Sequence, residues 1–177
     1  MKTPNQIRGH IGDNEMAILT KEASKVPKDG VIVEIGSYCG KSTVTLAIAN
    51  PMANVFAIDP WGDRVINGKP DPDKWDEFKN NIVGLSNITP IKDYSENVGA
   101  MWKLDINLLF IDGDHTKFGV YTDLQLWIPH VVKGGVVLLH DYTEKCGVRP
   151  AWESYLEIHE IEKRETQVIN SILRVQL

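Results

Sequence analysis

The sequence predicts an α/β fold with a mostly parallel β-sheet and helices on both of its faces. Short and almost wholly apolar segments, typical of buried parallel strands, alternate along the chain with longer segments of helical periodicity. Each apolar segment also ends at glycines or polar residues, as expected where ligands bind outside the carboxyl ends of strands. This alternation favours a parallel sheet whose strands are joined by right-handed crossovers.

In the first half of the chain, apolar strands alternate with amphipathic helices. Apolar residues at helical spacing predict the first helix, which Pro27 and a Lys-Asp-Gly turn bring to an end. Two apolar strands follow, and the helix between them begins at a Ser/Thr-rich segment. A polar, Pro- and Gly-rich loop comes next, and we expect it to form a rim over the site. The predicted ranges are helix 13–26, strand 31–35, helix 42–49, strand 54–59, loop 60–73 and helix 73–85.

In the second half, polar clusters follow the strands most clearly. A uniformly apolar strand opens into Asp-Gly-Asp-His, and the helix after it has one apolar face. Gly134 and Gly135 are expected to turn the chain into the next strand, which ends in His-Asp. A helix and an antiparallel edge hairpin are expected to complete the fold. The predicted ranges are strand 88–91, strand 106–111, helix 117–128, strand 136–139, a helix from 151, and hairpin strands 160–165 and 168–176.

Length and composition indicate one globular domain, residues 1–177, in which residues 1–29 form an N-terminal helical cap segment. The net charge is −5 and no Lys/Arg run occurs, which argues against a nucleic-acid partner. No apolar segment reaches the length of a membrane span, and the N-terminus lacks a signal-peptide core. We therefore expect a cytoplasmic protein with no membrane partner, and a homo-oligomer stays open. Cys39 and Cys146 fit a reducing compartment and show no metal-ligand spacing.

The segment VIVEIGSYCGKS, Val31 to Ser42, has the strand, tight turn and helix start of a nucleotide-type cofactor site. It is one residue short of a P-loop, because Gly36 and Gly40 enclose only three residues. A dinucleotide fingerprint would need a second glycine where Tyr38 stands, so NAD is disfavoured although not excluded. S-adenosylmethionine (SAM) has no phosphate, and its sulfonium and ribose hydroxyls suit nearby carboxylates such as Glu34. SAM is therefore the favoured cofactor.

Two further positions fit a cofactor at this turn. Asp59 ends the second strand 23 residues after Gly36, the spacing at which an acid meets a ribose. Ser42 stands at the start of the following helix, whose N-terminal N–H groups are expected to face the cofactor.

Four segments, in this order, resemble class I SAM-dependent methyltransferases, specifically the group that contains macrocin-type O-methyltransferases. They are VEIGSYCGKST, AIDPW, WDEFKNNIVGL and LLFIDGDHTKFGVYTDLQLWIPHVVKGGVVLLHDY, within about Gly30 to Val148. The resemblance implies a Rossmann-like, doubly wound, seven-stranded sheet whose last strand is antiparallel, which agrees with the hairpin. It departs at Tyr38, where the commoner methyltransferase motif has glycine. The resemblance implies that Glu34, Gly36, Ser37 and Gly40 line the SAM pocket, that Asp59 holds the ribose, and that Asp93 and Ser95 lie near the adenine.

A second constellation follows the strands 106–111 and 136–139, which should be neighbours about 4.8 Å apart. Asp112 and Asp114 can then converge with His140 and Asp141. Two carboxylates and an imidazole suit a divalent cation such as Mg²⁺ or Mn²⁺, with Asp112, His140 and Asp141 as ligands. Related sugar and catechol O-methyltransferases place a metal on acids at the positions that match Asp112 and Asp141. His140 stands where some relatives have a second acid, which weakens the case for Mg²⁺ itself.

The expected reaction is O-methylation of a small-molecule hydroxyl, on a sugar or a phenol. Methyl transfer is an in-line displacement, so the protein must orient the donor and make the acceptor nucleophilic. His115 or His140 is expected to be the base, or a metal at Asp112 and Asp141 lowers the acceptor pKa. We also assign Asp112 to the cofactor site. Trp61 and Tyr142 either form an apolar wall for the acceptor or pack internally.

Two functions from other classes stay open. One is a metal-dependent hydrolase that uses Asp112, His140 and Asp141 and needs no SAM. In that case the glycine turn and Asp59 would have no role. The other is a non-catalytic SAM-binding module with the same fold and pocket. Fold alone does not separate these from a methyltransferase, because function depends on the site.

Overall fold

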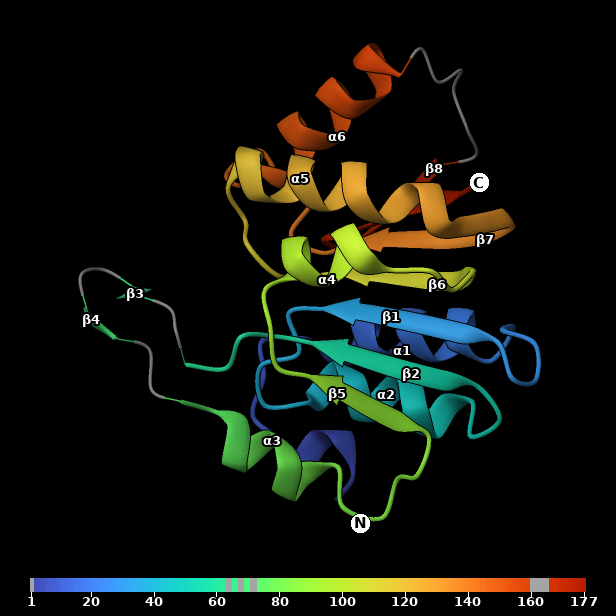
Figure 1. The fold of residues 1–177 in the computed structure, drawn as a ribbon, viewed down its shortest axis with the longest axis vertical. Coiled ribbons are helices and arrows are strands. Elements are labelled where there is room, and N and C mark those ends of the chain that lie inside the picture. Colours follow the sequence, from blue (N-terminus) through green and yellow to red (C-terminus); the bar gives the residue numbers. More distant parts are fainter. Residues whose placement is uncertain (1, 63–64, 67–68, 71–72, 160–165) are drawn as a thin grey trace.

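The computed structural model describes residues 2–62, 65–66, 69–70, 73–159 and 166–177, and it confirms the doubly wound α/β fold. Seven strands form one sheet in the order β5-β2-β1-β6-β7-β9-β8 (Figure 1). The first five strands of this order are parallel to one another, and β9 is antiparallel to both β7 and β8. The strands are β1 (Val31–Ile35), β2 (Asn54–Ile58), β5 (Ile88–Ile91), β6 (Ile106–Ile111), β7 (Val131–Leu139), β8 (Thr166–Ile169) and β9 (Ile172–Gln176).

Within the described residues, six α-helices connect and cover these strands. The long loop predicted after β2 contains two very short strands, β3 (Val65–Ile66) and β4 (Lys69–Pro70), which pair with each other. The helices are α1 (Asp13–Ala23), α2 (Lys41–Ala49), α3 (Trp75–Asn81), α4 (Ser95–Met101), α5 (Lys117–Trp127) and α6 (Val148–Ile158), with 3₁₀ turns η1 (Pro4–Gln6) and η2 (Ile128–His130). No helix in the described ranges is both long enough and apolar enough to span a bilayer.

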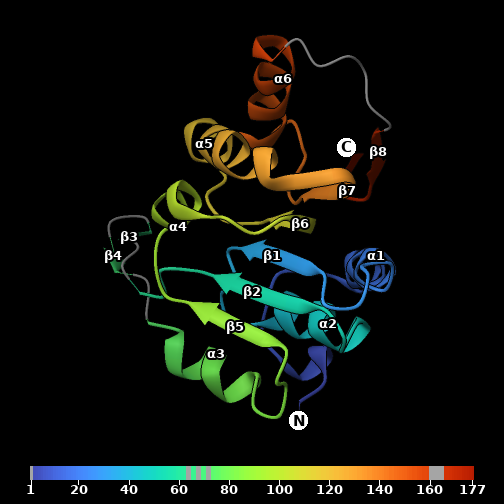
Figure 2. The same ribbon diagram turned by 45° about the vertical axis from the view of Figure 1, so that its right-hand side comes forward.

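Alternation of side chains along the strands gives the sheet two cores, one on each face. In β6, Leu108 and Phe110 join the core formed with α1, α2 and Phe78 of α3. Leu109 and Ile111 point to the other face, into the core formed with α5 and α6. Figure 2 shows α1 and α2 on one side of the sheet and α4 and α5 on the other. Because both faces of the central strands are covered, nearly every residue in them is apolar.

The parallel strands bring the functional segments to one edge of the sheet. In Figure 1 the arrowheads of β1, β2, β5 and β7 lie on the left, the side on which β3 and β4 project. The chain segments that follow these strands therefore meet there, as expected for a ligand site in a doubly wound sheet.

Helices α1 and α3 are shorter than the predicted 13–26 and 73–85, α6 begins at 148 rather than 151, and two strand boundaries were also wrong. Gly134 and Gly135 do not precede the fifth parallel strand but lie inside it, because β7 begins at Val131 and its register with β6 shifts there. Gly134 has φ +83°, which lets the strand kink without ending it.

The hairpin is present, but its turn lies inside the segment 168–176 that we predicted as one strand. Asn170 has φ +54° and joins β8 to β9, since asparagine tolerates the left-handed conformation of a tight hairpin turn. The predicted strand 160–165 lies outside the described residues. Helix α4 was not predicted, because it is short and lacks a clear apolar stripe.

The cap segment is tied to the far end of the chain through α1. Glu22, on the buried face of α1, lies 3.1 Å from Nε of Arg174 in β9 and 2.8 Å from Nζ of Lys25. The buried carboxylate is therefore paired, and it joins the N-terminal helix to the C-terminal strand.

Candidate functional site

The turn after β1 is formed by two glycines in conformations that other residues adopt at a cost. Gly36 has φ +87°, and a Cβ placed on it would lie 2.2 Å from the backbone oxygen of Asp112. Gly40 has φ +90° and is the N-cap of α2. The glycine at position 36 therefore allows the turn after β1 to touch the turn after β6.

Glu34 supports this turn from within the core. It is fully buried, and its Oε2 accepts hydrogen bonds from Ser37 Oγ at 2.7 Å and from Thr43 Oγ1. Burial raises the pKa of Glu34 to about 7, although the hydroxyls of Ser42, Thr43 and Ser37 oppose that shift. The Glu34 side chain lines neither the small cavity beside Asp59 nor the large cavity beside the glycine turn. Its predicted contact with the cofactor therefore stays a prediction.

Asp59, at the end of β2, fixes the backbone of two loops. Its Oδ2 accepts from the N–H of Tyr38 at 2.9 Å, and its Oδ1 accepts from the N–H of Trp61 at 2.8 Å. A carboxylate has about four acceptor positions, so ribose hydroxyls could still bind to it. Asp59 also borders a small cavity of about 50 Å³, together with Gly36, Lys74 and Asp112.

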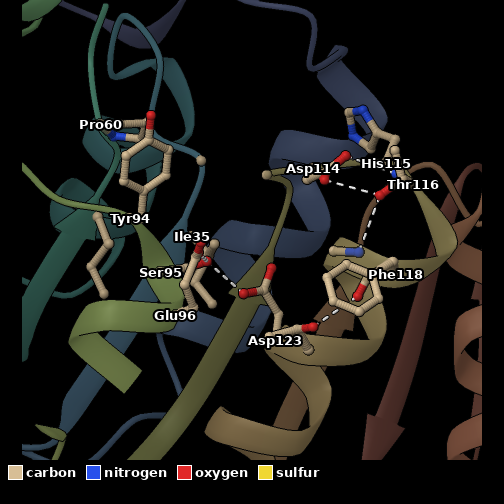
Figure 3. A pocket seen from close by; sticks show the side chains of 15 residues that line it. Ile35, Pro60, Tyr94, Ser95, Glu96, Asp114, His115, Thr116, Phe118 and Asp123 are labelled. Carbon is tan, nitrogen blue, oxygen red and sulfur yellow. Dashed lines mark hydrogen bonds between the residues drawn. The ribbon is translucent and has the colours of Figure 1, made fainter. Parts of the chain in front are cut away.

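A much larger cavity of about 880 Å³ opens beside the glycine turn (Figure 3). Ile35 and Gly36 of the turn line it, and so do residues at the start of α4 and before α5. Ser95 Oγ donates to Asp123 Oδ1 at 2.6 Å, which joins α4 to α5 at the cavity wall. Phe118 is 82% exposed at this wall. The volume lies within the ~300–1,000 Å³ typical of small-molecule sites.

Of the twelve predicted site residues, five line these cavities and seven do not. Gly36, Ser95 and His115 line the large cavity, and Asp59 and Asp112 line the small one. Asp93 instead accepts hydrogen bonds from Tyr94 N–H and Asn97 Nδ2 at the start of α4. The remaining predicted residues border neither cavity: Glu34, Ser37, Gly40, Ser42, Asp93, His140 and Asp141.

Trp61 packs internally and does not form a free wall for an acceptor. It is 2% exposed, and its ring lies 4.5 Å from the Phe78 ring and 4.7 Å from the Trp75 ring, centroid to centroid. Its Nε1–H donates to the Tyr38 backbone oxygen at 2.7 Å. Of the two alternatives that the sequence left open for Trp61, the structure supports packing.

The turns after β6 and β7 bring four titratable side chains together. Asp112, His115, His140 and Asp141 each offer one ligand atom, and these four atoms lie within 4.8 Å of one another. His140 Nδ1 lies 2.9 Å from Asp112 Oδ1, and His115 Nε2 lies 3.2 Å from Asp141 Oδ2. The sequence predicted three members of this cluster as metal ligands, and His115 is a fourth candidate.

The charges within the cluster stabilise each other. Burial acts to lower the pKa of His140, but the carboxylates of Asp112, Asp141 and Glu15 raise it to about 9. A side-chain hydrogen bond with Asp112 raises the pKa of His115 as well. Burial opposes ionisation of Asp112, yet contact with His115 and His140 lowers its pKa. Without a metal ion, His140 is therefore expected to carry a proton near neutral pH, beside the ionised Asp112 carboxylate.

Glu15 is the neighbour of this cluster that sequence reasoning missed. Its Oε1 lies 3.3 Å from His140 Nε2 and accepts a hydrogen bond from Ser171 Oγ in the β8–β9 turn. In the sequence Glu15 is only an acid in the first turn of a predicted helix. In the structure it accepts a hydrogen bond from the Gly12 N–H at that helix start. The tertiary fold alone brings it to His140.

A comparison with family models matches residues 33–142 to a methyltransferase domain. Among curated proteins, the uncharacterized protein R132 of Acanthamoeba polyphaga mimivirus is 35% identical over 133 residues, or 72% of this chain. The chain spans 58% of the length of that relative.

Solved structures with the same fold include two methyltransferase-type proteins. The O-methyltransferase NovP is 19% identical with a TM-score of 0.70, over 94% of this chain and 80% of its own. The SMU.1697c protein of Streptococcus mutans, in complex with SAH, is 13% identical with a TM-score of 0.65, over 95% of this chain and 100% of its own. The TM-scores show a shared fold, and at identities this low the likeness shows the fold alone.

Proposed function

The chain belongs to the methyltransferase domain family and has the Rossmann-like fold of class I SAM-dependent methyltransferases, and we propose that it methylates a small-molecule hydroxyl with SAM. One observation carries this proposal. The large cavity extends from the glycine turn after β1 to His115, which belongs to the polar cluster after β6 and β7. A cofactor site and a reaction site therefore adjoin.

In this proposal SAM lies along the carboxyl edge of the sheet, with the ribose at Asp59 and the adenine beside Ser95. The cavity volume and the free acceptor positions of Asp59 support it. Oxygen is the proposed methyl acceptor by analogy with the O-methyltransferase NovP, and a sugar or a phenol is proposed from the resemblance to macrocin-type O-methyltransferases.

The proposed reaction is an in-line displacement at the methyl carbon. The acceptor oxygen forms the new C–O bond as the C–S bond breaks, and the electron pair of that bond stays on sulfur, which gives S-adenosylhomocysteine (SAH). The hydroxyl proton must leave, and His115 is the proposed acceptor for it, because its imidazole is 43% exposed and borders the cavity. Asp112 and Asp141 orient this imidazole from 3.3 and 3.2 Å.

The cluster also fits a divalent cation. Two carboxylates and two imidazoles offer ligand atoms at close mutual distances, and the buried ring nitrogens of His140 make no well-aligned hydrogen bond within the described ranges. Asp112, His140 and Asp141 are the proposed ligands, and His115 stays beside the site as the proposed proton acceptor. A cation bound there would lower the pKa of an acceptor hydroxyl.

Calorimetric titration with SAH tests the cofactor assignment first. We expect micromolar binding by the purified chain and a loss of at least tenfold in affinity for Asp59→Ala. Asp76→Ala is a control, since its carboxylate is 89% exposed on α3, pairs with Lys79 and borders neither cavity, and it should bind SAH within about threefold of the unchanged chain.

A folded sample that does not bind SAH would contradict the proposal, and chelator-sensitive hydrolysis by that sample would then favour the metallohydrolase. SAH binding without methyl transfer to any sugar or phenol of an acceptor panel would favour a binding module.

A further inference from the structure

The imidazole of His140 lies between carboxylates on opposite sides of its ring. On one side Nδ1 is 2.9 Å from Asp112 Oδ1 and 3.4 Å from Asp141 Oδ2. On the other side Nε2 is 3.3 Å from Glu15 Oε1. The residue is 5% exposed, so water has little access to either nitrogen. The Nδ1 side of the ring therefore faces the cluster, and the Nε2 side has a buried contact with the Glu15 carboxylate.

Glu15 is itself fixed by two segments that lie far apart in the sequence. Its Oε2 accepts from the N–H of Gly12 at 2.9 Å, and its Oε1 accepts from Ser171 Oγ. A carboxylate held at both oxygens has little freedom to turn away from His140. The position of this carboxylate is therefore set by the start of α1 and by the β8–β9 turn.

This arrangement is the one that a metal-binding histidine needs. An imidazole binds a cation through one nitrogen, and its other nitrogen commonly donates its proton to a carboxylate that fixes the ring. Within the described ranges, neither nitrogen of His140 makes a hydrogen bond of good geometry, although both are buried beside carboxylates. A cation between Nδ1, Asp112 and Asp141 would give Nδ1 a partner and leave Nε2–H to Glu15.

We propose that Glu15 is a positioning residue that directs Nδ1 of His140 toward the Asp112–Asp141 cation site, and that this site therefore prefers a transition-metal cation such as Co²⁺ to Mg²⁺. Mg²⁺ selects oxygen ligands and octahedral geometry, whereas imidazole suits later first-row cations. The inference deepens the proposed function and rests on its cation site, but not on SAM or on the acceptor.

Glu15→Gln is the decisive variant, measured by Co²⁺ titration of the metal-free full chain. The Gln oxygen can still accept from Gly12, and its amide can donate to Ser171, but it presents a donor to Nε2–H of His140. We expect Co²⁺ affinity to fall about 10- to 100-fold, as for the loss of other such carboxylates. The visible absorption of bound Co²⁺ should change as well, since the imidazole is no longer held.

Glu22→Gln is the matched control on the same helix. Glu22 is also buried and also joins α1 to the C-terminal hairpin through Arg174, but none of its contacts involves the cluster. This variant should lose stability and keep Co²⁺ affinity within about twofold. Ser171→Ala removes one hydrogen bond that fixes Glu15 without touching the helix, and it should weaken Co²⁺ binding by about two- to fivefold.

Two results would overturn the inference. One is a Glu15→Gln protein that binds Co²⁺ with the affinity and spectrum of the unchanged chain. The other is Mg²⁺ binding as tight as Co²⁺ binding, because the imidazole would then contribute no preference. SAH affinity of the same samples reports on the proposed cofactor separately, so failure of one proposal does not imply failure of the other.

Discussion

Glu34 is fully buried and Asp112 is partly buried, both near strand ends, yet their pKa values shift in opposite directions. Burial raises the pKa of Glu34 to about 7, because its close partners are hydroxyls, which stabilise a negative charge only partly. Burial also acts to raise the pKa of Asp112, but hydrogen bonds and charges from His115 and His140 lower it. The difference suits their proposed roles, since one carboxyl supports a turn and the other binds cations or protons.

The raised pKa of Glu34 gives a pH-dependent prediction for stability. From pH 4.5, its ordinary pKa, to about pH 7, the folded state holds one proton more at Glu34 than the unfolded state does. Glu34 therefore makes the free energy of unfolding fall as pH rises through that window, by about 3 kcal/mol in all. Above pH 7 the group is ionised in both states and has no further effect.

Glu34→Gln removes this titration and keeps a carbonyl oxygen for Ser37 and Thr43. The free energy of unfolding of the variant, minus that of the unchanged chain, should increase by about 2–3 kcal/mol between pH 5 and pH 8. Urea unfolding at both pH values measures this difference, in which the titration of other groups largely cancels. Parallel pH profiles for the two proteins would show that Glu34 is not protonated near neutrality.

At the scale of the elements, strands and the turns after them were the most predictable features. Buried parallel strands need uninterrupted apolar residues, and a positive φ at Gly36 needs glycine, so both leave a local pattern. The meeting of Asp112 with His140 followed from strand adjacency, as expected. Glu15 could not be predicted in the same way, because its contact with His140 depends on how α1 docks on the sheet.

Two glycines with nearly the same φ allow a comparison of the glycine turn after β1 with a kink inside β7. Gly36 and Gly134 have φ +87° and +83°, but a Cβ on Gly134 meets nothing within 4 Å. Gly134→Ala should therefore destabilise the fold by only about 1–2 kcal/mol, from backbone strain, and keep SAH affinity. Gly36→Ala also places its Cβ against the Asp112 backbone, so the two turns must separate, and SAH binding should fall at least tenfold.

Urea unfolding and SAH titration of both alanine variants check this prediction. Equal SAH affinity for Gly36→Ala and Gly134→Ala would show that the contact between the turns after β1 and β6 is unimportant for the cofactor.

The whole molecule consists of two cores that share a single sheet, so we predict that it unfolds as one unit. Leu108 and Leu109 are neighbours in β6, both essentially fully buried, and they enter opposite cores. Leucine-to-alanine replacement at a buried site costs about 2–5 kcal/mol, and either loss weakens the strand on which the other core depends. Leu108→Ala and Leu109→Ala should therefore each lower the stability of both faces.

The test compares unfolding of the two faces in urea, with Trp61 as the reporter for one core and Trp127 for the other. Single-tryptophan variants, with the other tryptophans replaced by phenylalanine, separate these signals. In each leucine variant we expect one transition with a common midpoint for both reporters and for circular dichroism. If Leu108→Ala shifted the Trp61 transition alone, the cores would be independent units, and the single domain predicted from the sequence would be wrong. Coincident shifts would mean that side chains packed on one face stabilise the other through the shared strands.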